Sequence, residues 1–142
     1  MNLIAIALVG LLTVGLLNQP NPNFPREKMN LTPVQSQQVS ANLVKTLKDH
    51  LPPANIILVF EHNKTHLSTA IEVALRQQGY AIINKNDRGG THRLSYAIGA
   101  IQDEWAVVEL SISNGLTWTQ AFSVQGETVM PVGAASFKHH DS

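Results

Sequence analysis

The chain has 142 residues, which is enough for one ordinary domain and too short for two domains with cores of their own. Ten basic residues balance ten acidic ones, so composition gives no reason to expect a nucleic acid or a polyanionic substrate as partner. The sequence has no cysteine. This excludes disulfides, thiolate metal sites, cysteine nucleophiles and a lipid-modified N-terminal cysteine.

The N-terminal segment, residues 1–17, is apolar and carries no charged side chain. As a helix, the 15 residues from Leu3 to Leu17 would be about 22 Å long, which is short for a hydrocarbon core of about 30 Å. We predict an uncleaved membrane anchor, with a cleaved secretory signal and a buried core helix as alternatives. An anchor or a signal would place the rest of the chain outside the cytoplasm. The expected membrane-contacting residues are Leu3, Ile4, Ile6, Leu8, Val9, Leu11, Leu12, Val14, Leu16 and Leu17.

A linker rich in proline and asparagine is expected over residues 18–31. Pro20, Pro22 and Pro25 favour extended backbone and disfavour helix. The segment has no apolar periodicity, so we expect a semi-rigid spacer. Phe24 is its candidate contact to a partner protein.

Two helices are predicted in the folded part, residues 32–137. Thr32, Pro33 and Gln35 form a capping-box pattern at the start of the first helix, which should end at the proline pair 52–53. Its apolar stripe is Val39, Leu43, Val44, Leu47 and Leu51. The second helix is expected over residues 65–78, with Gly79 after its end. Its buried side should consist of Leu67, Ile71, Ala74 and Leu75.

Strands are predicted around and after the second helix. The segment 55–60 is continuously apolar after Asn55, which predicts a central strand buried on both faces. Residues 80–83 predict a strand that completes a β-α-β unit. Alternating patterns after Thr91 predict an antiparallel meander. Side-chain parity favours a three-residue turn at 113–115, with Leu110 opposite Trp118.

The same parity argument places a second three-residue turn at 102–104, with Ile101 opposite Trp105. Those two residues and Val107 would then lie on the polar face of the sheet, so we expect something to cover that end. Pro131 indicates that the last strand, near residues 129–132, lies at an edge. Residues 138–142 should form a polar tail. The predicted fold class is α+β, with two helices on a mixed, mostly antiparallel sheet of four to six strands, preceded by the membrane helix or signal segment.

No residue pattern in the chain predicts an active site. His62 and His66 have a metal-ligand spacing but straddle a predicted loop, and the His139–His140 pair lies in the tail. The segment 87–90 lacks the spacing of a phosphate-binding loop, Ser95 and Ser111 lie in strands, and the adjacent Asp103 and Glu104 lie in a turn. Trp118 and Tyr96 fit the core face. We therefore predict no catalytic residue, no metal site and no cofactor.

Several segments resemble TrbH-like conjugal transfer proteins. They are residues 51–54 before the apolar strand, residues 74–82 with the letters ALRQQGYAI, and the ending GETVMPVG over residues 126–133. The resemblance implies a non-enzymatic envelope component of a mating-pair formation, or type IV secretion, system. Family members are typically lipoproteins, but this chain has no cysteine to lipidate, which favours the uncleaved helix as its attachment.

We therefore expect a structural, protein-binding subunit of a conjugative secretion apparatus, anchored in the membrane with its domain in the periplasm. Its expected partners are other secretion-channel proteins, with further copies of itself in a ring as a possibility, and no direct contact with nucleic acid. The candidate contacts are Phe24, Val129 and Pro131, where an edge strand would accept a neighbouring strand. The alternative is a stand-alone periplasmic domain that binds a small ligand or a cell-wall component.

Overall fold

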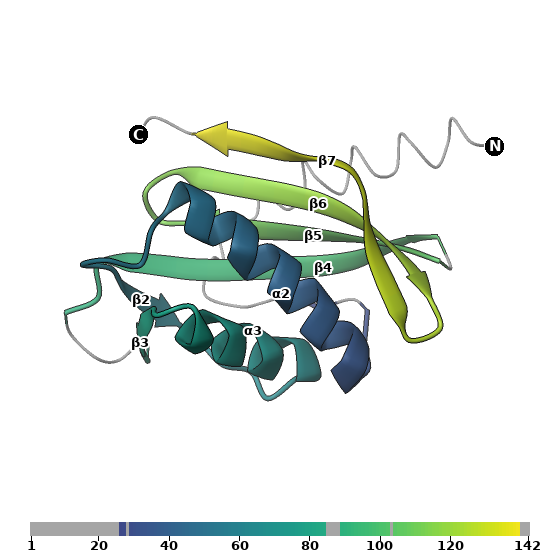
Figure 1. Cartoon of the computed structure of the whole chain (residues 1–142), viewed down its shortest axis with the longest axis horizontal. Helices are drawn as coiled ribbons and strands as arrows, with labels where there is room; N and C mark the ends of the chain where they lie inside the picture. The colour runs from purple at the N-terminus through teal and green to yellow at the C-terminus, as the bar shows by residue number, and fades with distance from the viewer. Residues whose placement is uncertain (1–25, 28, 85–88, 103, 140–142) are drawn as a thin grey trace.

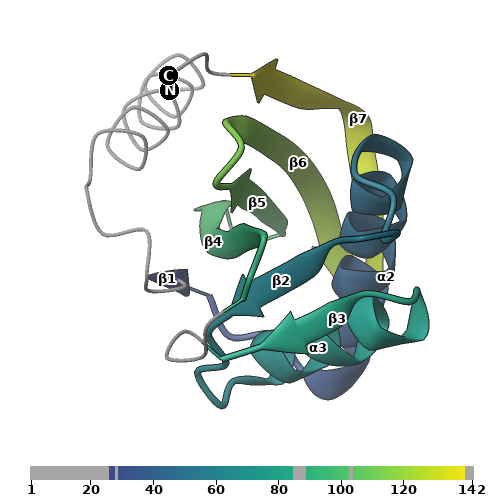
Figure 2. The ribbon, with the colours of Figure 1, turned by 90° about the vertical axis from the view of Figure 1, so that its left-hand side faces the viewer.

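The computed structural model describes residues 26–27, 29–84, 89–102 and 104–139. The expected anchor and Phe24 lie outside these ranges. Two helices lie on one face of a mixed sheet (Figures 1 and 2), which confirms the predicted α+β fold. The sheet has the order β3-β2-β4-β5-β6-β7, and a two-residue β1 pairs with β4 in addition. The elements are β1 (Arg26–Glu27), α2 (Pro33–His50), β2 (Ile57–Phe60), α3 (His66–Gln77), β3 (Ala81–Ile83), β4 (His92–Gln102), β5 (Trp105–Ile112), β6 (Leu116–Gln125) and β7 (Thr128–His139).

Both helices begin at capping threonines. The Thr32 side chain accepts a hydrogen bond from the Gln35 amide at 3.1 Å, and the Gln35 side chain accepts one from the Thr32 amide at 2.9 Å. This is the predicted capping box, which satisfies amides that have no partner within the helix. Thr65 caps α3 in the same way through the amide of Ser68. Gly79 follows α3 with φ at +96°, a conformation that glycine adopts without strain.

The helices bury the apolar stripes that the sequence predicts. In α2 the exposed fractions of Val39, Leu43 and Leu47 are 0%, 1% and 4%. In α3, Leu67, Ile71 and Leu75 are buried, and Ala74 is half-buried against the same core. After α3, the Tyr80 side chain is buried and its hydroxyl donates a hydrogen bond to the carbonyl of Leu51. These contacts join the ends of the two helices to the sheet.

Within the described ranges, helices cover only one face of the parallel part of the sheet. β2 lies between β3 and β4 and runs parallel to both. Its Leu58 and Phe60 are buried, whereas Ile57 and Val59 are half-buried. The expectation of a strand buried on both faces is therefore wrong, because both helices pack on the same side of the sheet.

The antiparallel meander confirms one predicted turn and corrects the other. Leu110 lies opposite Trp118, and the amide of Gly115 donates to the carbonyl of Ile112 at 3.0 Å. In the β4–β5 hairpin, however, Gln102 and not Ile101 lies opposite Trp105. The register shifts between Ala100 and Gln102, so Ile101 is the extra residue in β4. Gln102, which the parity argument assigned to the turn, therefore pairs with Trp105 in the strand.

The last strand, β7, lies at the edge of the sheet, as Pro131 predicts. It is longer than expected and includes Lys138 and His139, which the sequence had suggested for the polar tail. Its register against β6 shifts between the pair Thr119–Ser136 and the pair Ala121–Val132. This shift forms a bulge in β7.

The Gln120 side chain fills the bulge from β6. Its exposed fraction is 5%, and its amide nitrogen donates to the carbonyls of Val132 at 3.1 Å and Gly133 at 3.3 Å. Gly133 has a φ of +70°, which the bulged backbone requires. A buried glutamine thus pairs with carbonyls that the irregular strand would otherwise leave unsatisfied.

Part of the expected linker 18–31 belongs to the folded domain. Arg26 and Glu27 lie opposite Ala97 and Ile98 in parallel register, on the edge of β4 that β2 leaves open. Leu31 is 3% exposed and joins the core. The folded part therefore begins before residue 32.

Candidate interaction surfaces

The β6–β7 turn is tied to the start of α2 by two glutamines. Gln35 donates to the carbonyl of Gly126 at 2.6 Å, and Gln38 donates to the carbonyl of Glu127 at 2.5 Å. The side-chain oxygen of Gln38 also accepts a hydrogen bond from the amide of Val129 at 2.9 Å. One helix side chain thus satisfies a donor and an acceptor of the edge strand.

These contacts leave residues 129–131 of the β7 edge without a free amide that points away from β6. Amides of an edge strand point alternately toward and away from the neighbouring strand. The Val129 amide binds Gln38 of α2, so it points away from β6, and Pro131, two residues on, has the same direction but no N–H. A strand that added to this edge would find no hydrogen-bond donor at residues 129 and 131. Residues 134–139 have neither the bond to Gln38 nor a proline, and we call them the unsealed half of the β7 edge.

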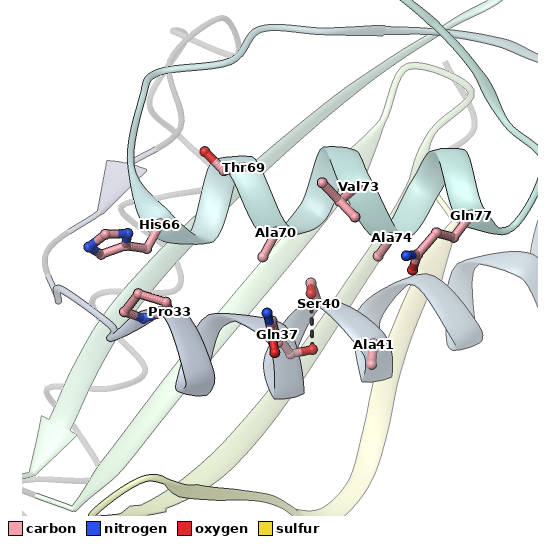
Figure 3. Close-up of a pocket in the computed structure, with 10 residues that line it drawn as sticks. All are labelled: Pro33, Gln37, Ser40, Ala41, His66, Thr69, Ala70, Val73, Ala74 and Gln77. Atoms are coloured by element: carbon pink, nitrogen blue, oxygen red, sulfur yellow. Dashed lines mark hydrogen bonds between the residues drawn. The ribbon is translucent and has the colours of Figure 1, made fainter.

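A groove runs between the two helices on the outer surface (Figure 3). Its volume is about 480 Å³, and small side chains at the helix contact leave this space open. Its lining contains no aspartate, glutamate, lysine or arginine, and Val73 within it is 48% exposed. The lining residues are Pro33, Gln37, Ser40, Ala41, His66, Thr69, Ala70, Val73, Ala74 and Gln77.

An aromatic cluster joins the end of α2 to the end of β7. The rings of His50 and Phe137 stack with centroids 4.0 Å apart, and Phe137 lies 6.5 Å from the ring of Trp118. Trp118 is 3% exposed, and its indole N–H has no hydrogen-bond partner among the described residues. Phe137 itself is 38% exposed, so the cluster reaches the surface at the unsealed half of the β7 edge.

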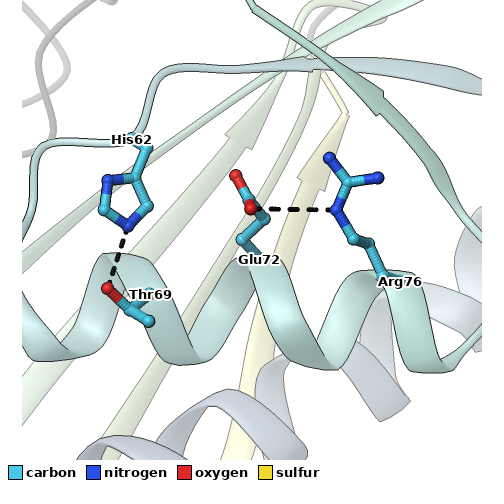
Figure 4. Close-up of polar contacts among 4 residues, drawn as sticks. All are labelled: His62, Thr69, Glu72 and Arg76. Atoms are coloured by element: carbon cyan, nitrogen blue, oxygen red, sulfur yellow. Dashed lines mark hydrogen bonds and ion pairs between the residues drawn. The ribbon is translucent and has the colours of Figure 1, made fainter.

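His62, in the loop between β2 and α3, serves local structure in this fold (Figure 4). The His62 ring shares a hydrogen bond of 2.9 Å with the Thr69 hydroxyl on α3, and further along the helix Glu72 and Arg76 approach to 3.7 Å. No group of three or more histidines and carboxylates in the described part of the chain is arranged to hold a metal ion. His66 lies at the groove.

The other described residues considered for chemistry do not form a common site. Ser95 and Ser111 face each other across β4 and β5 as strand residues, and His139 closes β7. Asp87, Asp103 and His140 lie outside the described residues.

Of the predicted partner contacts, Phe24 lies outside the described residues and Pro131 is exposed on β7. The Val129 side chain is 7% exposed and its amide is bonded to Gln38, so within this structure neither is open to a partner. The role of Gln38 could not be predicted from the sequence, because a polar residue on a helix does not indicate which strand lies beside it. None of the helices in the described ranges is both long and apolar enough to cross a bilayer.

One buried carboxylate, Glu109 on β5, also went unpredicted. Its exposed fraction is 8%, and burial raises its pKa, while the positive charge of Lys138 acts in the opposite direction. Glu109 lies on the face of β5 opposite the helices, in register with Ala97 and Thr119. Its burial there was not visible from the sequence.

Comparison with known proteins gives one match. A family model described as conjugal transfer protein TrbH matches residues 18–141, which is most of the chain. No curated protein and no solved structure matches it.

Proposed function

Because the chain belongs to the TrbH family of conjugal transfer proteins, we propose that it is a structural, protein-binding subunit of a conjugative type IV secretion apparatus. The family match carries this proposal, since it covers the whole described domain and implies a part in conjugal transfer in association with the cell envelope. The finer role, which is to hold other apparatus proteins in place, is supported by the kind of surfaces that the domain presents.

The proposed arrangement places residues 3–17 in a membrane and the domain in the periplasm. The apolar segment carries no charge, and the proline-rich stretch after it would hold the domain away from the bilayer. β1 continues that stretch directly into the sheet.

We propose a non-enzymatic role because the described residues that attract attention as chemical groups serve structure. His62 is bonded to Thr69, and Ser95 and Ser111 face each other in the sheet. The features that remain are surfaces for binding, and the unsealed half of the β7 edge, residues 134–139, is the place where a neighbouring strand would add. Other secretion-channel proteins are the expected partners.

A second candidate function is a stand-alone periplasmic domain that binds a small uncharged ligand or a cell-wall component. The observation that favours it is the groove between α2 and α3, whose volume of about 480 Å³ falls in the range of small-molecule sites. Its uncharged lining fits a neutral, partly apolar ligand.

Affinity purification from detergent-solubilised envelopes of donor cells separates the two candidates. The first predicts that mating-pair formation proteins co-purify with the full chain and that a variant lacking residues 134–139 loses at least part of this set. A monomer without such proteins, whose melting temperature rises with added cell-wall fragments, would contradict the first candidate and support the second. Deletion of residues 140–142 alone is the matched control.

A further inference from the structure

The sheet has one face that the helices do not cover in the described part of the chain (Figure 2). We call it the open face. Its residues alternate with the core residues along each strand, and the register places them in rows across the sheet. Its members in β2 and β4 are Ile57, Val59, Arg93, Ser95, Ala97 and Gly99, and the register of β1 places Arg26 opposite Ala97. The others are Trp105, Val107, Glu109 and Ser111 on β5, Thr117, Thr119, Ala121 and Ser123 on β6, and Met130, Val132, Ser136 and Lys138 on β7.

One end of the open face is apolar and exposed. Trp105 lies opposite Ser123, which lies opposite Met130, and the exposed fractions of this Trp and Met are 38% and 62%. The next row holds Val107 and Val132 on either side of an alanine. Tryptophan and methionine are enriched in protein interfaces, and neighbouring exposed apolar side chains of this size mark interaction sites.

The middle of the open face carries a carboxylate without a partner. Glu109 is 8% exposed and lies in register between Ala97 and Thr119, neither of which carries a charge. No hydrogen bond or ion pair to another described residue engages it, and the charge of Lys138 acts on it only from the edge of the sheet. A buried carboxylate without a partner is costly, and a cation supplied by a binding partner would remove that cost.

The distance along β5 between the apolar end and Glu109 determines how far apart the contacting side chains of a binding partner must be. Glu109 lies four residues along β5 from Trp105, a separation of about 13 Å at about 3.3 Å per residue. A helix laid along the strand rises about 1.5 Å per residue, so side chains seven or eight residues apart on one of its faces span about the same length.

We propose that the open face binds an apolar helix of another subunit, which places a lysine or arginine against Glu109 and, seven or eight residues away, apolar side chains against Trp105 and Met130. This inference rests on the proposed function as an apparatus subunit. The occupant is a separate protein and not the chain's own N-terminal segment, because residues 2–17 contain no charged side chain to pair with the carboxylate.

Site-specific photocrosslinking in donor cells tests this proposal with the full chain. A p-benzoylphenylalanine in place of Met130 should form an adduct with a peptide of another transfer protein, and that peptide should be apolar with a lysine or arginine at the stated spacing. The same photoprobe in place of Val73, which is 48% exposed on α3, is the control and should not label that peptide. An adduct with residues 2–17, with a second copy of the chain, or with a peptide that lacks a basic residue would overturn the proposal, as would the absence of any adduct.

A charge exchange then tests the role of Glu109. E109K should reduce the adduct yield at least tenfold, and replacing the partner's basic residue with glutamate should restore it in that background. E109Q, which keeps the shape of the side chain, checks that loss of yield does not come from unfolding: its melting temperature should stay at or above that of the wild type while its yield falls. An unchanged yield in E109K would refute the pairing.

A failure of the open-face proposal can be distinguished from a failure of the proposed function. If deletion of the gene abolishes plasmid transfer and the photoprobe at position 130 gives no adduct, the open-face proposal fails and the proposed function stands. If the deletion leaves transfer unchanged, the proposed function itself fails.

Discussion

Replacing Gln38 with alanine tests how the edge of the sheet is sealed. The variant loses two hydrogen bonds to the β6–β7 segment, one to the carbonyl of Glu127 and one from the amide of Val129. It also loses a longer bond of 3.3 Å to the carbonyl of Val34 within α2, which is exposed and contributes little. At about 1 kcal/mol of net stability for each bond, the free energy of unfolding should fall by about 1–2 kcal/mol. For a domain of about this size, that corresponds to a fall in melting temperature of about 4–8 °C.

Gln37→Ala is the matched control, because it makes the same change one residue away. Gln37 is exposed and lines the groove, and its side chain makes none of the bonds to the β6–β7 turn. Both substitutions raise helix propensity by the same few tenths of a kcal/mol, so the difference between the two variants isolates the contacts to the edge strand. Thermal melts of the full chain in detergent, followed by circular dichroism, measure it.

A second effect of Gln38→Ala should appear at the edge itself. The Val129 amide becomes free to pair with another strand, so the variant should self-associate at concentrations where the wild type and Gln37→Ala do not. Light scattering during size-exclusion chromatography measures this. Equal melting temperatures and equal masses for the two alanine variants would refute the reasoning.

Three further predictions concern the core and the close approaches of the backbone. Gly90→Ala should destabilise the fold, because its new Cβ would lie 2.2 Å from a methyl carbon of Val59. Gly99→Ala has open space around its new Cβ and should be neutral or stabilising. Chemical denaturation of the two variants compares their free energies of unfolding. Tyr80→Phe should cost about 1 kcal/mol through loss of one hydrogen bond. Burial raises the pKa of Tyr80 to about 12, so its contribution should be complete below pH 10 and lost as the pH rises toward 12, which phenolate absorbance during alkaline unfolding follows. Trp118→Phe breaks no hydrogen bond, so it should cost well below the about 3–5 kcal/mol of Trp118→Ala in urea unfolding.

The parts of the fold that the sequence predicted are those controlled by local chemistry. The α2 capping box needs only Thr32, Pro33 and Gln35 in the right order, and the register of the β5–β6 hairpin follows from the parity of its apolar residues around Gly115. Pro131 lies at an edge because an interior strand would need its amide. These signals lie within a few residues of the feature they determine.

The errors arise where one residue leaves the regular pattern or where a distant element decides. The irregularity between Ala100 and Gln102 shifts the register by an amount that parity cannot detect. The bulge that Gln120 fills breaks the alternation of β7. The sequence pattern therefore predicts only the part near residues 129–132, whereas the strand continues to His139. β1 has two residues, too few for any periodicity, and it pairs with β4 about 70 residues later in the chain.

The candidate surfaces were less predictable than the fold for the same reason. Sequence reasoning identified the β7 edge through Pro131. Its expectation that something covers the end of the sheet with Trp105 and Val107 stays a prediction, which the proposed helix of a partner would fulfil. Sequence reasoning did not identify the Gln38 seal or the burial of Glu109, because each depends on which residues of other elements lie opposite.

Plasmid transfer frequency is the most direct measure of the central claim, which is that this chain holds together a conjugative apparatus through an envelope-anchored binding domain. A donor strain that lacks the gene should transfer its plasmid at a frequency reduced by several orders of magnitude, and the full chain supplied in trans should restore it. The same chain without residues 2–17 should fail to restore transfer although its domain is intact. Transfer at the parental frequency in the deletion strain would contradict the account.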